Sequence, residues 1–179
     1  MERQTSYSAR MPRRIERPIT VPLAAAVRSN GEIGVLAHHG FGSFDIKVMY
    51  YIAGRVVRLE WVDPHIMLDL EVEPGLMVPP DIWSIQMPRD AEIAMSIPDD
   101  LVPLTIGPRP ETWELTMPSL DRARKIGLDR EAVEPGRMIA GVGYRGCDAQ
   151  DNEFRCDLLL IDRKAYALRP FALPPETCV

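Results

Sequence analysis

The sequence lacks several features that would point directly to a common function. No apolar run approaches the roughly 20 residues that a helix needs to cross a bilayer. There is no Gly-x-Ser-x-Gly elbow and no phosphate-binding loop. Nucleophilic catalysis therefore has no motif to support it, and no internal repeat indicates a solenoid or an array.

The chain has no excess of basic charge, and cysteine is scarce. The net charge of −5 at pH 7 argues against a general nucleic-acid or anionic-membrane surface, because both require a basic patch. The three cysteines are spaced too widely for a zinc-binding Cys-x-x-Cys pair. Their odd number leaves at least one thiol unpaired or bonded to another chain.

Proline, in contrast, is abundant, with 17 residues spread along the chain. Each proline removes a backbone donor and disfavours helix at the residue before it. Long helices are therefore not expected, and short strands joined by ordered loops are. The length of 179 residues and the apolar content of 46% are those of one globular domain with its own core.

The first part of the chain has the composition of a leader or a flexible arm. Residues 1–36 begin with several arginines, and the apolar run Ile19–Val27 follows. This order predicts a secretory signal, and hence a periplasmic or secreted protein. The charged turn at 28–32 interrupts the apolar region, so a cytoplasmic location stays open if the leader is not functional. We expect a single β-barrel domain at 37–170 and a tail at 171–179.

The first predicted strand runs from about Met49 to Val62. Val57, Leu59 and Trp61 alternate with charged residues, which is the period-2 pattern of a half-buried strand. These three side chains are therefore expected to point into the core.

The second predicted strand, residues 65–73, follows a turn at Asp63-Pro64 and alternates more regularly. Its leucines share one face, whereas His65 falls on the polar face. A buried structural histidine would be in phase with the leucines. The register therefore favours a functional role for His65.

The rest of the chain predicts one helix and several further strands. The proline-rich residues 74–110 allow only short strands, near 82–87, 92–97 and 102–106. Residues 120–127 are predicted as a helix, with Ser119 as its N-cap and Gly127 at its end. Strands at 137–144 and 154–162 are predicted to form the last hairpin.

This order of elements predicts a mainly β fold. It suits a small, partly closed five-stranded barrel with one short helix, of the oligonucleotide/oligosaccharide-binding (OB) type. The predicted core consists of twelve apolar side chains: Val57, Leu59, Trp61, Ile66, Leu68, Leu70, Val72, Trp113, Leu115, Ile126, Leu158 and Leu160.

Two cysteines lie symmetrically about the tip of the predicted last hairpin. If the hairpin turns at Asp151-Asn152, Cys147 and Cys156 face each other within disulfide reach. We therefore expect a Cys147–Cys156 bridge, which would agree with an oxidising compartment.

Several short motifs occur together in this domain: Ala37-His38-His39, Phe41, Phe44, Asp45, Gly54-x-Val56, Trp61, Pro64-His65, Trp113, the helix at 120–127 and Glu134-Pro135-Gly136. In these motifs the chain resembles a family of small exported bacterial proteins of unknown function. Mature chains of that family begin near Ala-His-His-Ser-Phe and carry Asn-Pro-His after the first strand.

The resemblance covers about residues 36–169 and has three departures. Gly40 stands where the family has serine, Asp63 stands where it has asparagine, and residues 74–111 are longer than the family pattern. The resemblance implies an exported protein, but it implies no reaction.

All three histidines of the chain, His38, His39 and His65, lie within one segment. Neutral imidazoles are good ligands for Cu(II), Zn(II) or Ni(II), and a free N-terminal amine at His38 after cleavage would favour Cu(II). We therefore predict a transition-metal site, with copper favoured, formed by the three histidines. Three other side chains are predicted to orient or shield these ligands: Asp45, Asp63 and Trp61.

Two other functions stay open at this point. In the first, His65 and Asp63 act as an acid–base pair on a small apolar substrate. In the second, the barrel binds a ligand or a protein without chemistry, because fold alone does not decide function. The expected partner is a metal ion or a small molecule, not a nucleic acid. The sequence leaves the oligomeric state open.

Overall fold

The computed structural model describes residues 41–89, 91–148, 150–175 and 177–178. Within these residues, seven strands and three short helices follow one another: β1 (Tyr50–Glu60), β2 (Met67–Val72), η1 (Ile82–Ser84), β3 (Val102–Pro103), β4 (Glu111–Thr116), α1 (Leu120–Lys125), η2 (Arg130–Val133), β5 (Met138–Arg145), β6 (Glu153–Ile161) and β7 (Lys164–Ala167). The predicted leader lies outside the described residues.

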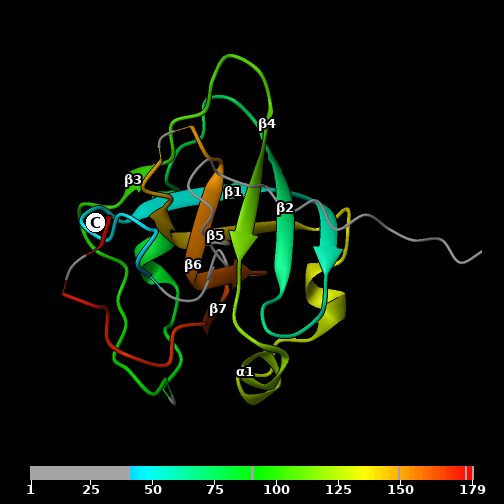
Figure 1. The fold of residues 1–179 in the computed structure, drawn as a ribbon, viewed down its shortest axis with the longest axis vertical. Helices are drawn as coiled ribbons and strands as arrows, with labels where there is room; N and C mark the ends of the chain where they lie inside the picture. Colours follow the sequence, from blue (N-terminus) through cyan, green and yellow to red (C-terminus); the bar gives the residue numbers. More distant parts are fainter. Residues whose placement is uncertain (1–40, 90, 149, 176, 179) are drawn as a thin grey trace, which may run out of the picture. The chain divides into compact units, whose positions relative to one another are not determined.

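Five of the strands close into a barrel (Figure 1). β1 pairs antiparallel with both β2 and β5, β2 pairs with β4, and β5 pairs with β6. The parallel pair of β4 and β6 closes the ring. The predicted mainly β, OB-like barrel is thereby confirmed, and the barrel is fully closed. β3 and β7 extend the sheet beside β1 and β6.

β2 follows the alternation that its sequence predicts. Leu68, Leu70 and Val72 are fully buried, whereas Glu71 on the other face is exposed. The buried face continues on β4, where Trp113 lies opposite Leu70. Most of the predicted core is thus confirmed, with Leu59, Trp61 and Ile126 at its partly buried margin. Leu158 and Leu160 are buried in a second cluster and not in the main core.

Val57 was predicted to be buried, and this prediction is wrong, because its side chain is 44% exposed. The pairing of β1 with β2 shifts between Val56 and Arg58, which leaves Val57 as the extra residue of a β-bulge. The inward face therefore changes phase, from Val56 before the bulge to Leu59 and Trp61 after it. Gly54 lets the two strands approach, since a Cβ there would lie 2.4 Å from the Glu71 carbonyl oxygen.

The proline-rich segment between β2 and β4 is less regular than predicted. Of its three expected strands, only β3 forms within the described residues, and 82–87 contains the 3-10 turn η1 instead. Ile82, Ile97 and Leu101 are buried in a second apolar cluster against β1, β5, β6 and β7. The segment therefore covers one outer side of the barrel.

The predicted helix is confirmed as α1, with Ser119 Oγ accepting a hydrogen bond from the Arg122 amide. A second cap comes from the turn before β2, where Asp63 Oδ1 accepts from the Leu120 amide at 3.0 Å. Gly127 follows the helix in the left-handed region.

The predicted Cys147–Cys156 disulfide is wrong. Cys147 bonds to Cys178, and Cys156 is a buried free thiol. Arg145 pairs with Phe154, so the hairpin turns earlier than a Cys147–Cys156 bridge requires, and Cys156 lies opposite Gly143. Figure 1 shows the tail leaving β7 and running back toward the start of the described chain.

Candidate functional site

The structure gives different roles to the residues that the sequence predicted for a site. His65 is partly buried beside a cavity, whereas Asp63 caps α1. Asp45 accepts a hydrogen bond from the Lys47 amide, and Trp61 packs against the main core.

The predicted metal centre gains no further ligands from the fold. His38 and His39 lie outside the described residues. Within the part of the chain that the structure describes, no three His, Cys, Asp or Glu side chains gather closely enough to hold a metal ion. The copper site therefore stays a prediction from the sequence.

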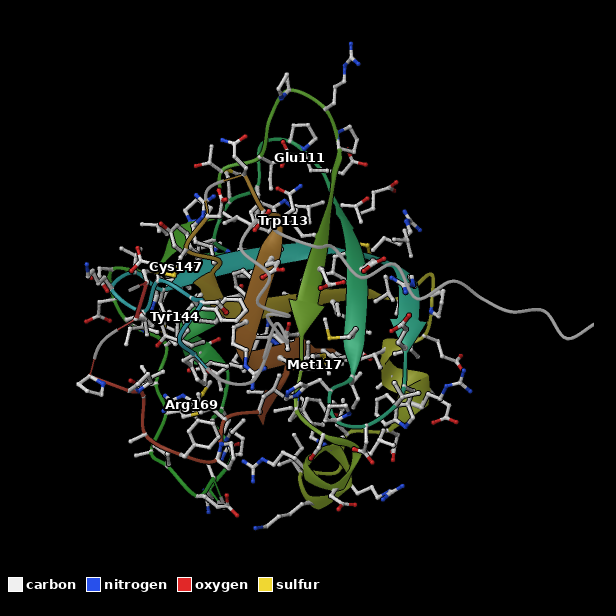
Figure 2. The ribbon with its side chains drawn as sticks, viewed as in Figure 1. Glu111, Trp113, Met117, Tyr144, Cys147 and Arg169 are labelled. Atoms are coloured by element: carbon white, nitrogen blue, oxygen red, sulfur yellow. A yellow bond between two sulfur atoms is a disulfide. The ribbon has the colours of Figure 1, made fainter. Side chains whose placement is uncertain are left out.

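A cavity of about 180 Å³ lies beside His65. Its lining comes from five separated parts of the chain: Phe41, the turn Pro64-His65, the approach to α1 at 118–122, β6 at 155–157 and the tail at 168–171. Figure 2 labels two residues of this region: Met117, which directly precedes the lining residues at 118–122, and Arg169 in the tail. The cavity thus unites the predicted His65 with residues that the sequence did not single out.

The course of β6 explains why a cavity forms here. β4 and β6 pair only as far as Thr116 and Arg155, after which β4 leads into the α1 approach. The pairing of β6 with β5 then shifts, and Asp157 is the extra residue of a β-bulge. Bulges commonly re-aim side chains beside functional sites. Gly143 makes the close approach possible, because a Cβ there would lie 2.0 Å from the Arg155 carbonyl oxygen.

Asp157 is a fully buried carboxylate in the cavity wall. Its Oδ2 accepts a hydrogen bond from Arg169 Nε at 2.7 Å. The described residues supply no partner for Oδ1. Burial raises the pKa of Asp157, and the hydrogen bond from Arg169 opposes that rise. Asp157 is thus a carboxylate that is only half satisfied by protein groups.

Arg155 is the second buried charge of the cavity, with a residual exposure of 8%. Its guanidinium lies over the Phe41 ring, 5.2 Å from the ring centroid, which is a cation–π arrangement. Burial lowers the pKa of Arg155. Among the described residues, no carboxylate forms a salt bridge with it, and its Nη1 has no hydrogen-bond partner. Such a buried cation is costly without an anion beside it.

The neighbouring arginine of the lining is, in contrast, fully engaged. Arg122 donates to the carbonyl oxygens of Ala167 and Leu168 and forms an ion pair with Glu92 at 3.1 Å. It therefore anchors the tail to α1. Arg155 remains the cation of the cavity that can accept a new anionic partner.

Two titratable neighbours of Asp157 are also buried away from water, and their pKa values are raised as a result. Burial and the Asp157 charge together raise the pKa of Tyr144 to about 12. The same two causes raise the pKa of the Cys156 thiol, whose Sγ donates to the Leu158 carbonyl oxygen at 3.1 Å. Cys156 is therefore a protonated core thiol and not a nucleophile.

Sequence reasoning missed Arg155 and Asp157, although one signal could have found them. They directly precede the apolar run 158–161, which is typical of a strand that is covered on both faces. Charged residues in such a strand are expected to be buried and partnered.

Fold and site together define the protein as an OB-like barrel with a charged cavity between its helix, its bulged strand and its C-terminal tail. No family model, curated protein or solved structure matches the chain. The likeness to small exported proteins therefore stays a prediction that rests on the short motifs. In the described residues, no helix has the length and apolarity to cross a membrane.

Proposed function

We propose that this protein is a ligand-binding module whose cavity beside His65 holds a small organic anion. The observation that carries the proposal is the buried Arg155 guanidinium, which forms no salt bridge with a carboxylate among the described residues, although the Asp157 charge acts on it from a distance. An anionic group at this position would form a charge-assisted hydrogen bond with Nη1 and neutralise the cation.

The other walls of the cavity narrow the class of ligand. Phe41 and Phe171 supply aromatic surface, and their rings meet edge-on with centroids 6.0 Å apart. A cavity of about 180 Å³ accommodates one ring-sized group. Asp157 Oδ1 offers an acceptor for a hydroxyl or amine donor. The best-fitting ligand is therefore a small aromatic acid that also carries a hydrogen-bond donor.

The position of the cavity on the barrel agrees with binding. OB-type barrels bind their ligands with the loop between the first two strands and with neighbouring loops. His65 lies in that loop here, two residues before the start of β2. The tail residues Arg169 and Phe171 contribute a wall that the barrel strands do not supply.

Titration calorimetry with mandelate and phenylacetate tests the proposal. Both probes carry a ring and a carboxylate. Only mandelate also has a hydroxyl group that can donate a hydrogen bond to Asp157 Oδ1. We expect mandelate to bind, and Arg155→Met to weaken its binding about tenfold or more, the loss of a charge-assisted hydrogen bond. Arg124→Met is the matched control, because the Arg124 side chain is 71% exposed.

Three results would count against the proposal. They are the absence of saturable binding for either acid, equal weakening by Arg155→Met and Arg124→Met, and unchanged affinity in a folded Arg155→Met protein. Circular dichroism of both variants establishes that they are folded. A tighter complex with mandelate than with phenylacetate would add support for Asp157 as an acceptor.

Acid–base chemistry is a second candidate function of the same cavity. The pKa of Asp157 is raised by burial, and such shifts are frequent in groups that transfer protons. Asp157 suits this role better than Asp63, whose carboxylate holds the α1 amide of Leu120. Proton exchange at the α-carbon of bound mandelate, followed by NMR in deuterated water, tests it. Asp157→Asn should abolish that exchange.

The predicted copper site and export of the protein remain proposals with tests of their own. Cu(II) titration of the natively produced protein and of His65→Ala measures whether His65 contributes a ligand, and binding should weaken below about pH 6 as imidazoles protonate. Mass spectrometry of the native N-terminus shows whether the predicted leader is cleaved.

A further inference from the structure

A second and larger cavity, of about 490 Å³, lies against β7 on the other side of Arg122. Its walls are residues 86–89 and 91 of the proline-rich segment, the last turn of α1 and residues 163–167 around β7. Met87, Ile126 and Ala165 give it an apolar floor. The proposed function does not involve this cavity.

The cavity is rich in positive charge, although the whole chain is acidic. Among the residues that the structure describes, its lining contains no carboxylate and five cationic side chains: Arg89, Arg122, Lys125, Arg163 and Lys164. Lys125 and Lys164 are two of the three lysines in the sequence. With a net charge of −5 for the chain, this gathering of cations concentrates a positive field in one hollow.

Part of this charge is already matched by two carboxylates that pair with the lining cations. Glu92 forms ion pairs with Lys125 and with Arg122 Nη1, and Asp81 forms one with Arg163. The bridge made by Glu92 shows that an anionic group fits between two of the cations. The pKa of Glu92 is lowered, chiefly by its hydrogen bond with Lys125.

Within the described residues, the other two cations, Arg89 and Lys164, have no such counter-charge. Lys164 has its Nζ 4.2 Å from the centroid of the Tyr166 ring. Across the residues that the structure describes, neither Lys164 nor Arg89 forms a salt bridge. Both are exposed, so a ligand reaches them without unfolding any element.

We propose that this cavity is a second binding site, specific for ligands that carry a chain of phosphate groups. Several separated cations around one hollow favour a ligand with several charges over a single carboxylate. The volume exceeds that of one phosphate and falls within the range of ordinary small-molecule sites. Inorganic polyphosphate and nucleoside polyphosphates share this chemistry.

Lysine acylation provides a test with an internal control. The protein is treated with an acetylating reagent, with and without tripolyphosphate, and the rate at each lysine is measured by mass spectrometry. At about ten times the dissociation constant, the rates at Lys125 and Lys164 should fall about tenfold, while the rate at Lys47 stays unchanged. Lys47 does not line the cavity.

Variants make the test independent of the labelling chemistry. Lys164→Glu should weaken the binding of tripolyphosphate about tenfold or more. Lys47→Glu makes the same change of charge and should leave the affinity for tripolyphosphate within about twofold of the wild type. Glu92→Gln should tighten binding, because it removes the carboxylate that competes for Lys125 and Arg122. Arg155→Met should change nothing, which separates this site from the proposed organic-anion cavity.

The two sources of phosphate are distinguished by ATP and adenosine. Equal affinities for ATP and tripolyphosphate assign the site to the phosphate chain, and a tighter complex with ATP adds the nucleoside to it. The proposal is overturned by adenosine binding as tightly as ATP, by equal protection of all three lysines, or by no saturable binding below about 1 mM.

Discussion

β2 and β6 run through the same barrel, yet their sequences relate to burial in opposite ways. β2 alternates, with Leu68 and Leu70 inside and Glu71 in water. In β6, every residue from Phe154 onward is buried, including Arg155 and Asp157. The outer side of β6 is covered by the proline-rich segment and the tail. A strand that is covered on both faces can place charged side chains in the interior. The candidate site lies at the two buried charges of β6.

The largest expected effect comes from leaving the buried carboxylate of β6 without its partner. Arg169→Ala removes the group that binds Asp157, so we expect a loss of about 3–5 kcal/mol in the free energy of unfolding. Arg137→Ala breaks an exposed pair with Asp162 and should cost about 1 kcal/mol or less. Urea denaturation measures both. Similar costs would mean that Asp157 is not isolated from water.

The next prediction tests the alternation on the β2 side of the comparison. Leu68→Ala should cost about 2–5 kcal/mol, because Leu68 is fully buried in the main core. Val57→Ala should stay within about 0.5 kcal/mol, since Val57 lies exposed on the β1 bulge. Thermal or urea unfolding compares the two variants. A costly Val57→Ala would show that the bulge is absent and that simple alternation extends through β1.

Removing the disulfide loosens the cover over β6. Cys147 and Cys178 close a loop with a sequence separation of 31, so Cys147→Ala with Cys178→Ala should cost about 2–4 kcal/mol. The same double substitution should weaken the binding of mandelate, because the tail supplies one wall of the cavity beside His65. Peptide mapping without reduction identifies the bridge. A Cys147–Cys156 peptide would contradict the register of the last hairpin.

The smallest effect concerns pH. The pKa of Asp157 is raised in the folded protein, so the folded state holds this proton more tightly than the unfolded chain does. The stabilisation from the protonated carboxyl is complete below the ordinary aspartate pKa of about 3.9 and is lost as pH rises through the raised value. Relative to Asp157→Asn, the wild type should therefore lose stability from about pH 4 upward. A relative gain over that range, measured by urea denaturation, would contradict the raised pKa.

The sequence by itself determined the local features of this protein. Alternation set the inward face of β2, and Ser119 and Gly127 marked the ends of α1. These predictions succeeded because each depends on residues close together in the chain. The order of strands and helix then restricted the topology to an OB-like barrel.

Tertiary structure decided the features that depend on distant segments. Whether Val57 or Val56 faces inward depends on a bulge in the pairing of β1 with β2. Cys147 reaches Cys178 because the tail returns past β6, a path that local pattern cannot show. The charged cavity exists only where five segments meet around Arg155 and Asp157. Burial of those charges is a property of what covers β6, and the covering residues lie far from them in the sequence.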